Sequence, residues 1–219
     1  MRRVVIIGAG ALAREVLDAL NACAAAGDPV EMVGFVVDPQ YSAAGTIING
    51  RPVLGGFDWL SRHAREVEAV CAVGQPDVRR QLILAAQAAG VAFTNVIHPS
   101  AITSPWVTMG QGNMVLAGAA LSCQVQMGHH VLVNFQVTVA HDVVLEDFVT
   151  VSPGVRLCGH VRVCRGAFVG AGATVIEKLT VGKWSLVGAG SAVVRNVPEG
   201  ATVLGVPATA VHIRQEMPD

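Results

Sequence analysis

A histidine and an aspartate stand side by side at residues 141 and 142, and this pair is well suited to acid–base chemistry. The two residues end the segment V-T-V-A-H-D at residues 137–142. A neutral imidazole can take a proton near physiological pH, and the neighbouring carboxylate can orient the ring or support its protonated form. Two alternatives stay open. His141 can be an ordinary solvated histidine, and Asp142 can point away from it, since adjacent residues on a strand edge face opposite sides.

A glycine-rich loop at residues 8–13 suggests a second site. Its sequence, G-A-G-A-L-A, follows the apolar run at residues 4–7. A G-x-G-x-x-A loop between a strand and a helix is the fingerprint of dinucleotide sites, in which the helix N-terminus receives a pyrophosphate. Asp38, at the end of the second apolar run, would then bind a ribose. The competing interpretation is that the glycines only allow a helix to pack closely.

The elements that must position this loop alternate between strands and helices through residue 100. Strands are expected at residues 4–7, 31–37, 70–73 and 91–96, and helices at 11–25, 59–66 and 77–89. This alternation predicts an α/β domain with a Rossmann-like parallel sheet over residues 1–100. About ninety residues are available here, which are fewer than a full dinucleotide domain needs.

A strict six-residue period replaces this alternation in the second half, which contains His141. Every sixth residue from Met109 to Val193 is aliphatic or methionine, and the column two positions earlier is small or aliphatic from Val125 to Ala173. Such a period predicts short strands joined by repeated corners and stacked into a parallel β-helix. Three hexads make one coil of eighteen residues. We expect this domain to span residues 101–219.

Composition narrows the class of protein. The chain has 219 residues, of which 52% are hydrophobic and 14% charged, and a net charge of −1. This balance disfavours nucleic acid as a partner and suggests apolar burial between subunits. The five cysteines form no CxxC pair, which argues against a disulfide scaffold or a structural zinc site and fits the cytoplasm. The apolar run near the N-terminus is too short for a signal peptide or for membrane insertion.

Several short motifs resemble known families. V-G-A-G-A-T at residues 169–174 and V-G-A-G-S-A at 187–192 resemble the hexapeptide repeats of left-handed β-helix acyltransferases. G-V-P-A at 205–208 resembles the G-x-P-A motif that closes the helix in that superfamily. The loop at residues 8–13, C-A-V-G-Q-P at 71–76 with Arg79-Arg80, and I-H-P-S-A at 97–101 occur in the order found in NeuD/PglD-type sugar acetyltransferases. This second resemblance covers essentially the whole chain.

The resemblance implies an enzyme of surface polysaccharide (such as O-antigen) biosynthesis. It would transfer an acetyl group from acetyl-CoA to the amine of a nucleotide-linked amino sugar, GDP-perosamine-like or a UDP-4-amino sugar. It implies a homotrimer without a catalytic metal. His141 would be the base, paired with Asp142. The nucleotide sugar would contact Gly10, Ala11, Leu12, Asp38 and Gly74, and acetyl-CoA would contact Asn134, Thr150, Gly159, Ala171 and Ala189.

Two of these positions depart from the family pattern. Family members often have Gly-His where this chain has Ala11-Leu12, and Thr150 replaces a common histidine. Any contact made by those histidine rings is absent here.

Three other functions remain open on the sequence. One is O-acetylation of sialic acid or another sugar. Another is a zinc site like that of the β-helical carbonic anhydrases, which would use three of His129, His130, His141 and His160 across a subunit interface. The last is a binding scaffold that keeps the fold without chemistry.

Overall fold

The computed structural model describes residues 1–214 of the chain. The chain divides into two compact units, Met1–Pro99 and Ser100–Asp219. No helix within residues 1–214 combines the length and the apolar character needed to cross a membrane.

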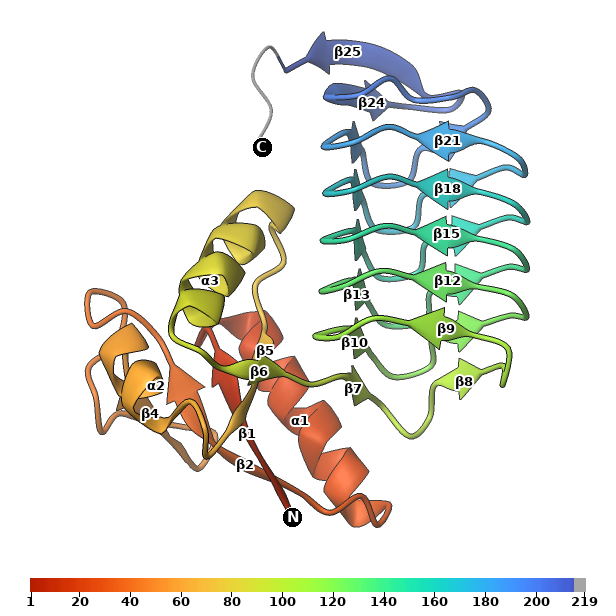
Figure 1. Ribbon diagram of the computed structural model, residues 1–219. Coiled ribbons are helices and arrows are strands. Elements are labelled where there is room, and N and C mark those ends of the chain that lie inside the picture. The colour runs from red at the N-terminus through yellow and green to blue at the C-terminus, as the bar shows by residue number, and fades with distance from the viewer. Residues whose placement is uncertain (215–219) are drawn as a thin grey trace. The chain divides into compact units, whose positions relative to one another are not determined.

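The first unit is built around a six-stranded sheet in the order β3-β4-β2-β1-β5-β6 (Figure 1). Its strands are β1 (Arg2–Ile7), β2 (Val30–Val36), β3 (Ile47–Ile48), β4 (Arg51–Gly55), β5 (Glu68–Cys71) and β6 (Ala92–Phe93). The helices are α1 (Ala11–Ala25), α2 (Phe57–His63) and α3 (Pro76–Ala88). All pairings are parallel except β3 with β4. Val4, Val5 and Ile6 of the central strand β1 are fully buried.

The hairpin of β3 and β4 was not anticipated from the sequence. Pro52 and Arg51 interrupt the apolar pattern there, but the turn residues Asn49 and Gly50 carry a strong signal. Both have positive φ, 45° and 78°, as a two-residue type I′ hairpin turn requires.

The prediction of one continuous strand at residues 91–96 was wrong. This segment is split into β6 and β7 (Val96–Ile97), and β7 lies outside this sheet. Between them, the Thr94 amide still donates to the Ala69 carbonyl at 3.1 Å, so the chain leaves the sheet only after Thr94. The strand expected at residues 70–73 begins two residues earlier, as β5.

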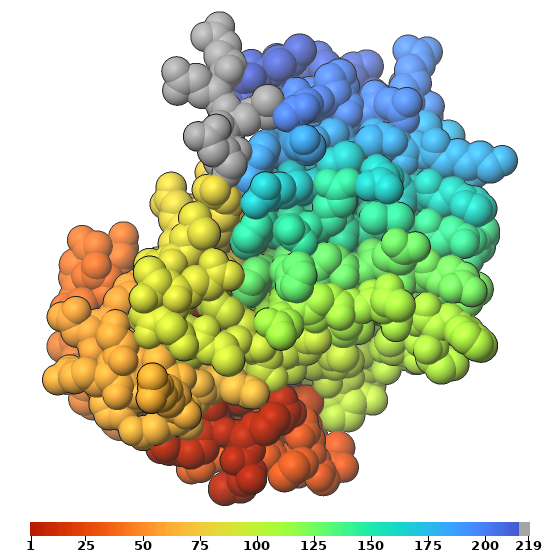
Figure 2. Space-filling model, in the orientation of Figure 1, coloured from red at the N-terminus to blue at the C-terminus, as the bar shows by residue number. Residues whose placement is uncertain are grey.

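The second unit is a left-handed parallel β-helix, whose coils Figure 1 shows stacked and Figure 2 shows as successive bands from green to blue. One face is ordered β23-β20-β17-β14-β11-β8 and a second β21-β18-β15-β12-β9; the third contains β24-β22-β19-β16-β13-β10, with β25 at its edge. The strands are β8 (Ile102–Thr103), β9 (Thr108–Met109), β10 (Met114–Val115), β11 (Ala120–Leu121), β12 (Gln126–Met127), β13 (Leu132–Val133), β14 (Thr138–Val139), β15 (Val144–Leu145), β16 (Thr150–Val151), β17 (Arg156–Leu157), β18 (Arg162–Val163), β19 (Phe168–Val169), β20 (Thr174–Val175), β21 (Thr180–Val181), β22 (Leu186–Val187), β23 (Ala192–Val193), β24 (Ala201–Leu204) and β25 (Thr209–Ile213).

The aliphatic columns expected from the six-residue period fill the interior. In the first column, every sixth residue from Val115 to Val193 is at most 5% exposed. In the second column, every sixth residue from Val125 to Ala173 is fully buried. Residues eighteen apart pair in register, as Val139 does with Leu157. One coil is therefore eighteen residues long, as predicted.

The corners of the β-helix repeat as strictly as its core. Every sixth residue from Gly112 to Gly190 has a positive φ. The non-glycine residues at these positions are Gln124, His130, Gln136, Asp142, Phe148, His160, Lys178 and Trp184. A side chain in this left-handed conformation costs about 1–2 kcal/mol. The hydrogen-bonded ladders between coils must offset that cost.

We expect Leu145→Ala to destabilise the β-helix by about 2–5 kcal/mol, because it opens a cavity at a fully buried position. Leu186→Ala is the matched control: its side chain is 37% exposed, and we expect a loss below about 1 kcal/mol. Urea unfolding followed by circular dichroism at one protein concentration measures both. Equal losses would show that the interior column does not hold the coils together.

Candidate active site

His141 and Asp142 form a hydrogen-bonded pair at an exposed corner of the β-helix. They follow β14, and the distance from His141 Nδ1 to Asp142 Oδ2 is 2.8 Å. The two side chains are 54% and 42% exposed, so a ligand can reach them. Because a carboxylate only accepts hydrogen bonds, Nδ1 carries the proton and donates a hydrogen bond to Asp142. The lone pair of the neutral ring is then on Nε2, where it can act as a base.

The left-handed corner brings this pair together. Asp142 has a φ of +59°, so the chain does not continue as an extended strand, and the two side chains do not alternate. Aspartate is one of the few residues that adopt this conformation readily. The alternative left open by the sequence, that Asp142 points away from His141, is thereby excluded.

Gly159 makes room for the His141 ring. It lies eighteen residues after His141, in the next coil, and is itself buried. A Cβ atom at Gly159 would lie 2.6 Å from His141 Cε1 and 2.7 Å from Nε2, which is too close for any real contact. Gly159 was predicted as a contact of acetyl-CoA; its position shows a steric role toward the histidine ring.

His160 lies on the other side of Asp142. Its Nε2 is 3.8 Å from Asp142 Oδ2, and its ring meets the His141 ring edge-on, with centroids 5.1 Å apart. The donor atoms of these three residues lie within 4.8 Å of one another, a spacing that a metal ion could use. His129 and His130 belong to a different corner, after β12, where the His130 ring is buried and stacks on Phe148.

The other residues predicted to contact acetyl-CoA lie elsewhere on the β-helix. We call the stacked corners that follow β11, β14, β17 and β20 the His141 ridge, and those that follow β13, β16, β19 and β22 the Ala189 ridge. Asn134, Ala171 and Ala189 belong to the Ala189 ridge, and both alanines are exposed. Thr150 is in β16 with a buried side chain. Within one chain, the two ridges lie at opposite ends of the strands of the sheet that contains β14, β17 and β20.

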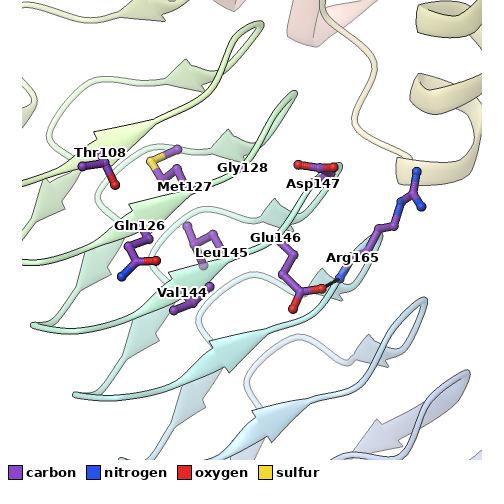
Figure 3. A pocket seen from close by; sticks show the side chains of 9 residues that line it. All are labelled: Thr108, Gln126, Met127, Gly128, Val144, Leu145, Glu146, Asp147 and Arg165. Atoms are coloured by element: carbon purple, nitrogen blue, oxygen red, sulfur yellow. Dashed lines mark hydrogen bonds between the residues drawn. The ribbon is translucent and has the colours of Figure 1, made fainter.

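A hollow of about 410 Å³ lies on the face that contains β9, β12 and β15 (Figure 3). Its polar rim includes Glu146, Asp147 and Arg165. Glu146 pairs with Arg162 at 2.5 Å and accepts a hydrogen bond from the Arg165 amide at 3.0 Å, while Asp147 accepts from the His129 amide at 2.7 Å. These carboxylates are already paired within the protein, and no predicted site residue lines the hollow.

The first unit contains a pocket of about 390 Å³ where β1, β2 and β5 end. Asp38 lies at its mouth together with Gln40 and Tyr41, and Phe57 is on its wall. Ligands of open α/β sheets bind at this edge, beyond the carboxyl ends of the strands. The Asp38 carboxylate accepts a hydrogen bond from the Gln40 amide at 3.0 Å and keeps further acceptor capacity for a ligand.

The glycine loop contributes to this pocket differently from the prediction. Gly8 lines it, with a φ of +106° and Ala72 O only 3.2 Å from where a Cβ would be, so only glycine fits. Four of the predicted contacts do not line the pocket: Gly10, Ala11, Leu12 and Gly74. Gly10 is the N-cap of α1, which has no side-chain cap, and a Cβ there would meet nothing within 4 Å.

A buried arginine holds the loop after β5, which forms one wall of the pocket. Arg79 is fully buried and donates from Nη1 to the carbonyls of Val73 and Gly74, at 2.8 and 2.9 Å. Burial lowers the pKa of Arg79 to about 10, so it stays charged at neutral pH. Burial also raises the pKa of Cys71 to about 12. Cys71 is therefore a packing residue, as the sequence suggested for the cysteines.

The comparisons with known proteins agree with this architecture. Residues 3–85 match the family model of the PglD N-terminal domain. The chain is 28% identical to the GDP-perosamine N-acetyltransferase of Escherichia coli O157:H7 over 214 residues, which is 93% of each chain.

Two solved structures are similar over nearly the whole chain. One is a histidine-to-alanine variant of the GDP-perosamine N-acetyltransferase from Caulobacter crescentus in complex with CoA and GDP-perosamine. It has a TM-score of 0.87 and 34% identity, and the match covers 95% of this chain and 96% of that one. The other is the acetyltransferase domain of PglB from Neisseria gonorrhoeae FA1090 with acetyl coenzyme A, with a TM-score of 0.85, 34% identity and coverages of 96% and 99%. The chain belongs to the NeuD/PglD-type sugar acetyltransferases of the left-handed β-helix (hexapeptide repeat) superfamily.

Proposed function

We propose that this protein transfers the acetyl group of acetyl-CoA to the amino group of a nucleotide-linked amino sugar, GDP-perosamine-like or a UDP-4-amino sugar. The observation that carries the proposal is the hydrogen-bonded pair of His141 and Asp142, exposed in a fold whose relatives bind CoA together with GDP-perosamine. The histidine changed in the Caulobacter variants has the same sequence number as His141, which supports its assignment to the reaction.

The chemistry proceeds by attack of the sugar amine on the thioester carbonyl. A nitrogen–carbon bond forms as the amine loses a proton to His141 Nε2, and the carbon–sulfur bond then breaks. The CoA thiolate leaves and takes this proton from His141 Nε2, so that neutral His141 is regenerated. Asp142 keeps the proton on Nδ1 and stabilises the imidazolium that forms transiently.

The nucleotide of the substrate is assigned to the pocket at the end of β1, β2 and β5. Asp38 would accept hydrogen bonds from the base or the ribose, and Tyr41 and Phe57 offer aromatic surface for stacking on the base. The uncapped N-terminus of α1 at Gly10 leaves amides for the diphosphate. The diphosphate would also lie near three other predicted contacts, Ala11, Leu12 and Gly74.

Acetyl-CoA is assigned to the Ala189 ridge, where the small side chains of Ala171 and Ala189 let the pantetheine arm approach the backbone. The Ala189 ridge and His141 lie at opposite ends of the strands of the sheet that contains β14, β17 and β20. One chain therefore does not bring the thioester to the base, and a neighbouring copy of the chain would bring it there. The predicted homotrimer provides such a neighbour, and each active site would then join two subunits.

Two rival functions make different predictions. A zinc hydratase would use the donor atoms around Asp142, and a chelator would abolish its activity; acetyl transfer should be unaffected by EDTA. A sugar O-acetyltransferase would release CoA thiol with sialic acid and not with amino-sugar nucleotides. A screen of both acceptor classes, reading free thiol with and without EDTA, separates these possibilities.

We expect His141→Asn to lower kcat by roughly 10²- to 10⁴-fold, the usual contribution of a general base. The base must be neutral, so wild-type kcat should fall toward acidic pH, and this limb should vanish in the variant. A matched control is His212→Asn in β25, which should keep wild-type kcat. If the acidic limb persists and the sugar KM rises instead, His141 binds the acceptor without taking its proton.

We expect Asp38→Ala to raise the KM or Kd for the nucleotide sugar by roughly 5- to 150-fold, corresponding to about 1–3 kcal/mol for a lost polar contact. The Kd of acetyl-CoA should not change. Asp58→Ala, at an exposed position in α2, serves as the control and should alter neither constant. Weaker binding of acetyl-CoA to the Asp38 variant would show that the two ligands are assigned to the wrong units.

We expect sedimentation to give three times the chain mass of 22.7 kDa. We also expect His141→Asn and Ala189→Trp, each inactive alone, to regain activity when co-expressed in mixed trimers. If each site joins two subunits, random mixing should restore about a quarter of the sites. A stable monomer at micromolar concentration, or no recovery on mixing, would contradict the shared site.

A further inference from the structure

The backbone places His160 next to the pair of His141 and Asp142. It lies eighteen residues after Asp142 and occupies the same left-handed corner one coil further on, with a φ of +58°. Its amide donates a hydrogen bond to the carbonyl of His141 at 3.0 Å. The ladder between β14 and β17 therefore sets where the His160 side chain begins, and it begins directly above Asp142.

The His160 side chain lies close to both members of the pair. Its Nε2 stands 3.8 Å from the Asp142 oxygen that accepts from His141, so the same carboxylate oxygen faces two imidazoles. Its ring also packs edge-on against the His141 ring, with an angle of 86° between the planes.

An exposed carboxylate needs such support. Asp142 is 42% exposed, and water competes for its oxygens. A carboxylate that turned toward solvent would release Nδ1, and the proton could then move to Nε2, which is the wrong tautomer for a base. At metal sites, the partners that orient a ligating histidine typically contribute about 10- to 100-fold to metal affinity or activity, and we expect an effect of similar size for a partner that orients a base.

We propose that His160 is a positioning residue for acetyl transfer, which acts on His141 through the Asp142 carboxylate so that His141 Nε2 stays unprotonated and directed at the acceptor amine. This inference rests on the proposed role of His141. His160 itself makes no contact with the reacting atoms. Its effect should therefore appear in kcat and should require Asp142.

The experiment compares His160→Asn with His160→Gln. Asparagine tolerates the left-handed conformation but is too short to reach Asp142, whereas the glutamine amide can place an N–H near the position of Nε2. We expect His160→Asn to lower kcat on the order of 10-fold with both KM values within about 2-fold of wild type, and His160→Gln to retain most of kcat. Lys178→Asn, at the next corner of the same ridge with a φ of +62°, is the matched control and should not change kcat.

A double-mutant cycle gives the decisive result. In an Asp142→Asn background, His160→Asn should cause no further loss of kcat, because the residue through which it acts is already disabled. The same loss in both backgrounds would overturn the inference. So would a rise in the sugar KM with unchanged kcat, which would make His160 a substrate contact. Equal losses in the Asn and Gln variants would also contradict it.

Including His141→Asn in the same series separates this inference from the proposed function. If His141→Asn is inactive while His160→Asn has wild-type kcat, only the role of His160 fails. If His141→Asn itself keeps full kcat, the assignment of the base fails, and the role of His160 falls with it. Thermal melting of each variant checks that the coils remain folded.

Discussion

The β-helix must turn three times per coil, and it does so through a left-handed residue at every sixth position. This requirement fixes more than the shape of the coil. It places side chains eighteen residues apart directly above one another, because the strands between the corners are paired in register. Buried aliphatic columns and hydrogen-bonded ladders stabilise the coils, and the left-handed corners, each with a conformational cost, are held in place by them.

The candidate active site is a consequence of that repetition. Asp142 turns back onto His141 because it is a left-handed corner residue, Gly159 leaves room for the ring because it is one coil above His141, and His160 reaches Asp142 because it is one coil above that residue. No loop or insertion is needed to assemble the group. The precision of the site therefore derives from the regularity of the scaffold, in which backbone strain at a functional corner is supported by neighbouring coils.

Much of this arrangement could be predicted from the sequence. The six-residue period gave the interior columns and the length of a coil, and α1 was placed at its observed bounds. The position of His160 over Asp142 follows from the same eighteen-residue spacing. It was not predicted because each histidine was considered by itself. The orientation of Asp142 could not be predicted by treating the segment as a strand, because the sign of φ at a non-glycine residue is set by the repeat as a whole.

The first unit was harder to predict in detail. Its sheet was expected, but the hairpin at Asn49-Gly50 was missed because Arg51 and Pro52 hide the strand that follows. The pocket involves Gly8, Tyr41 and Phe57, which come from separate loops after β1 and β2 and from α2. Their convergence depends on strand order, which the local sequence does not encode. The glycine fingerprint located a loop whose first residue, Gly8, lines the pocket.

The central claim is that Asp142 keeps His141 in the tautomer protonated at Nδ1, with a free lone pair on Nε2. Nitrogen-15 NMR of histidine-labelled protein at neutral pH measures this tautomer directly. The signals of His141 are assigned by comparison with the His141→Asn variant. The account predicts a pyrrole-type shift for Nδ1 and a pyridine-type shift for Nε2, and a loss of this preference in Asp142→Asn. A His141 ring protonated at Nε2 in the wild-type protein would contradict it.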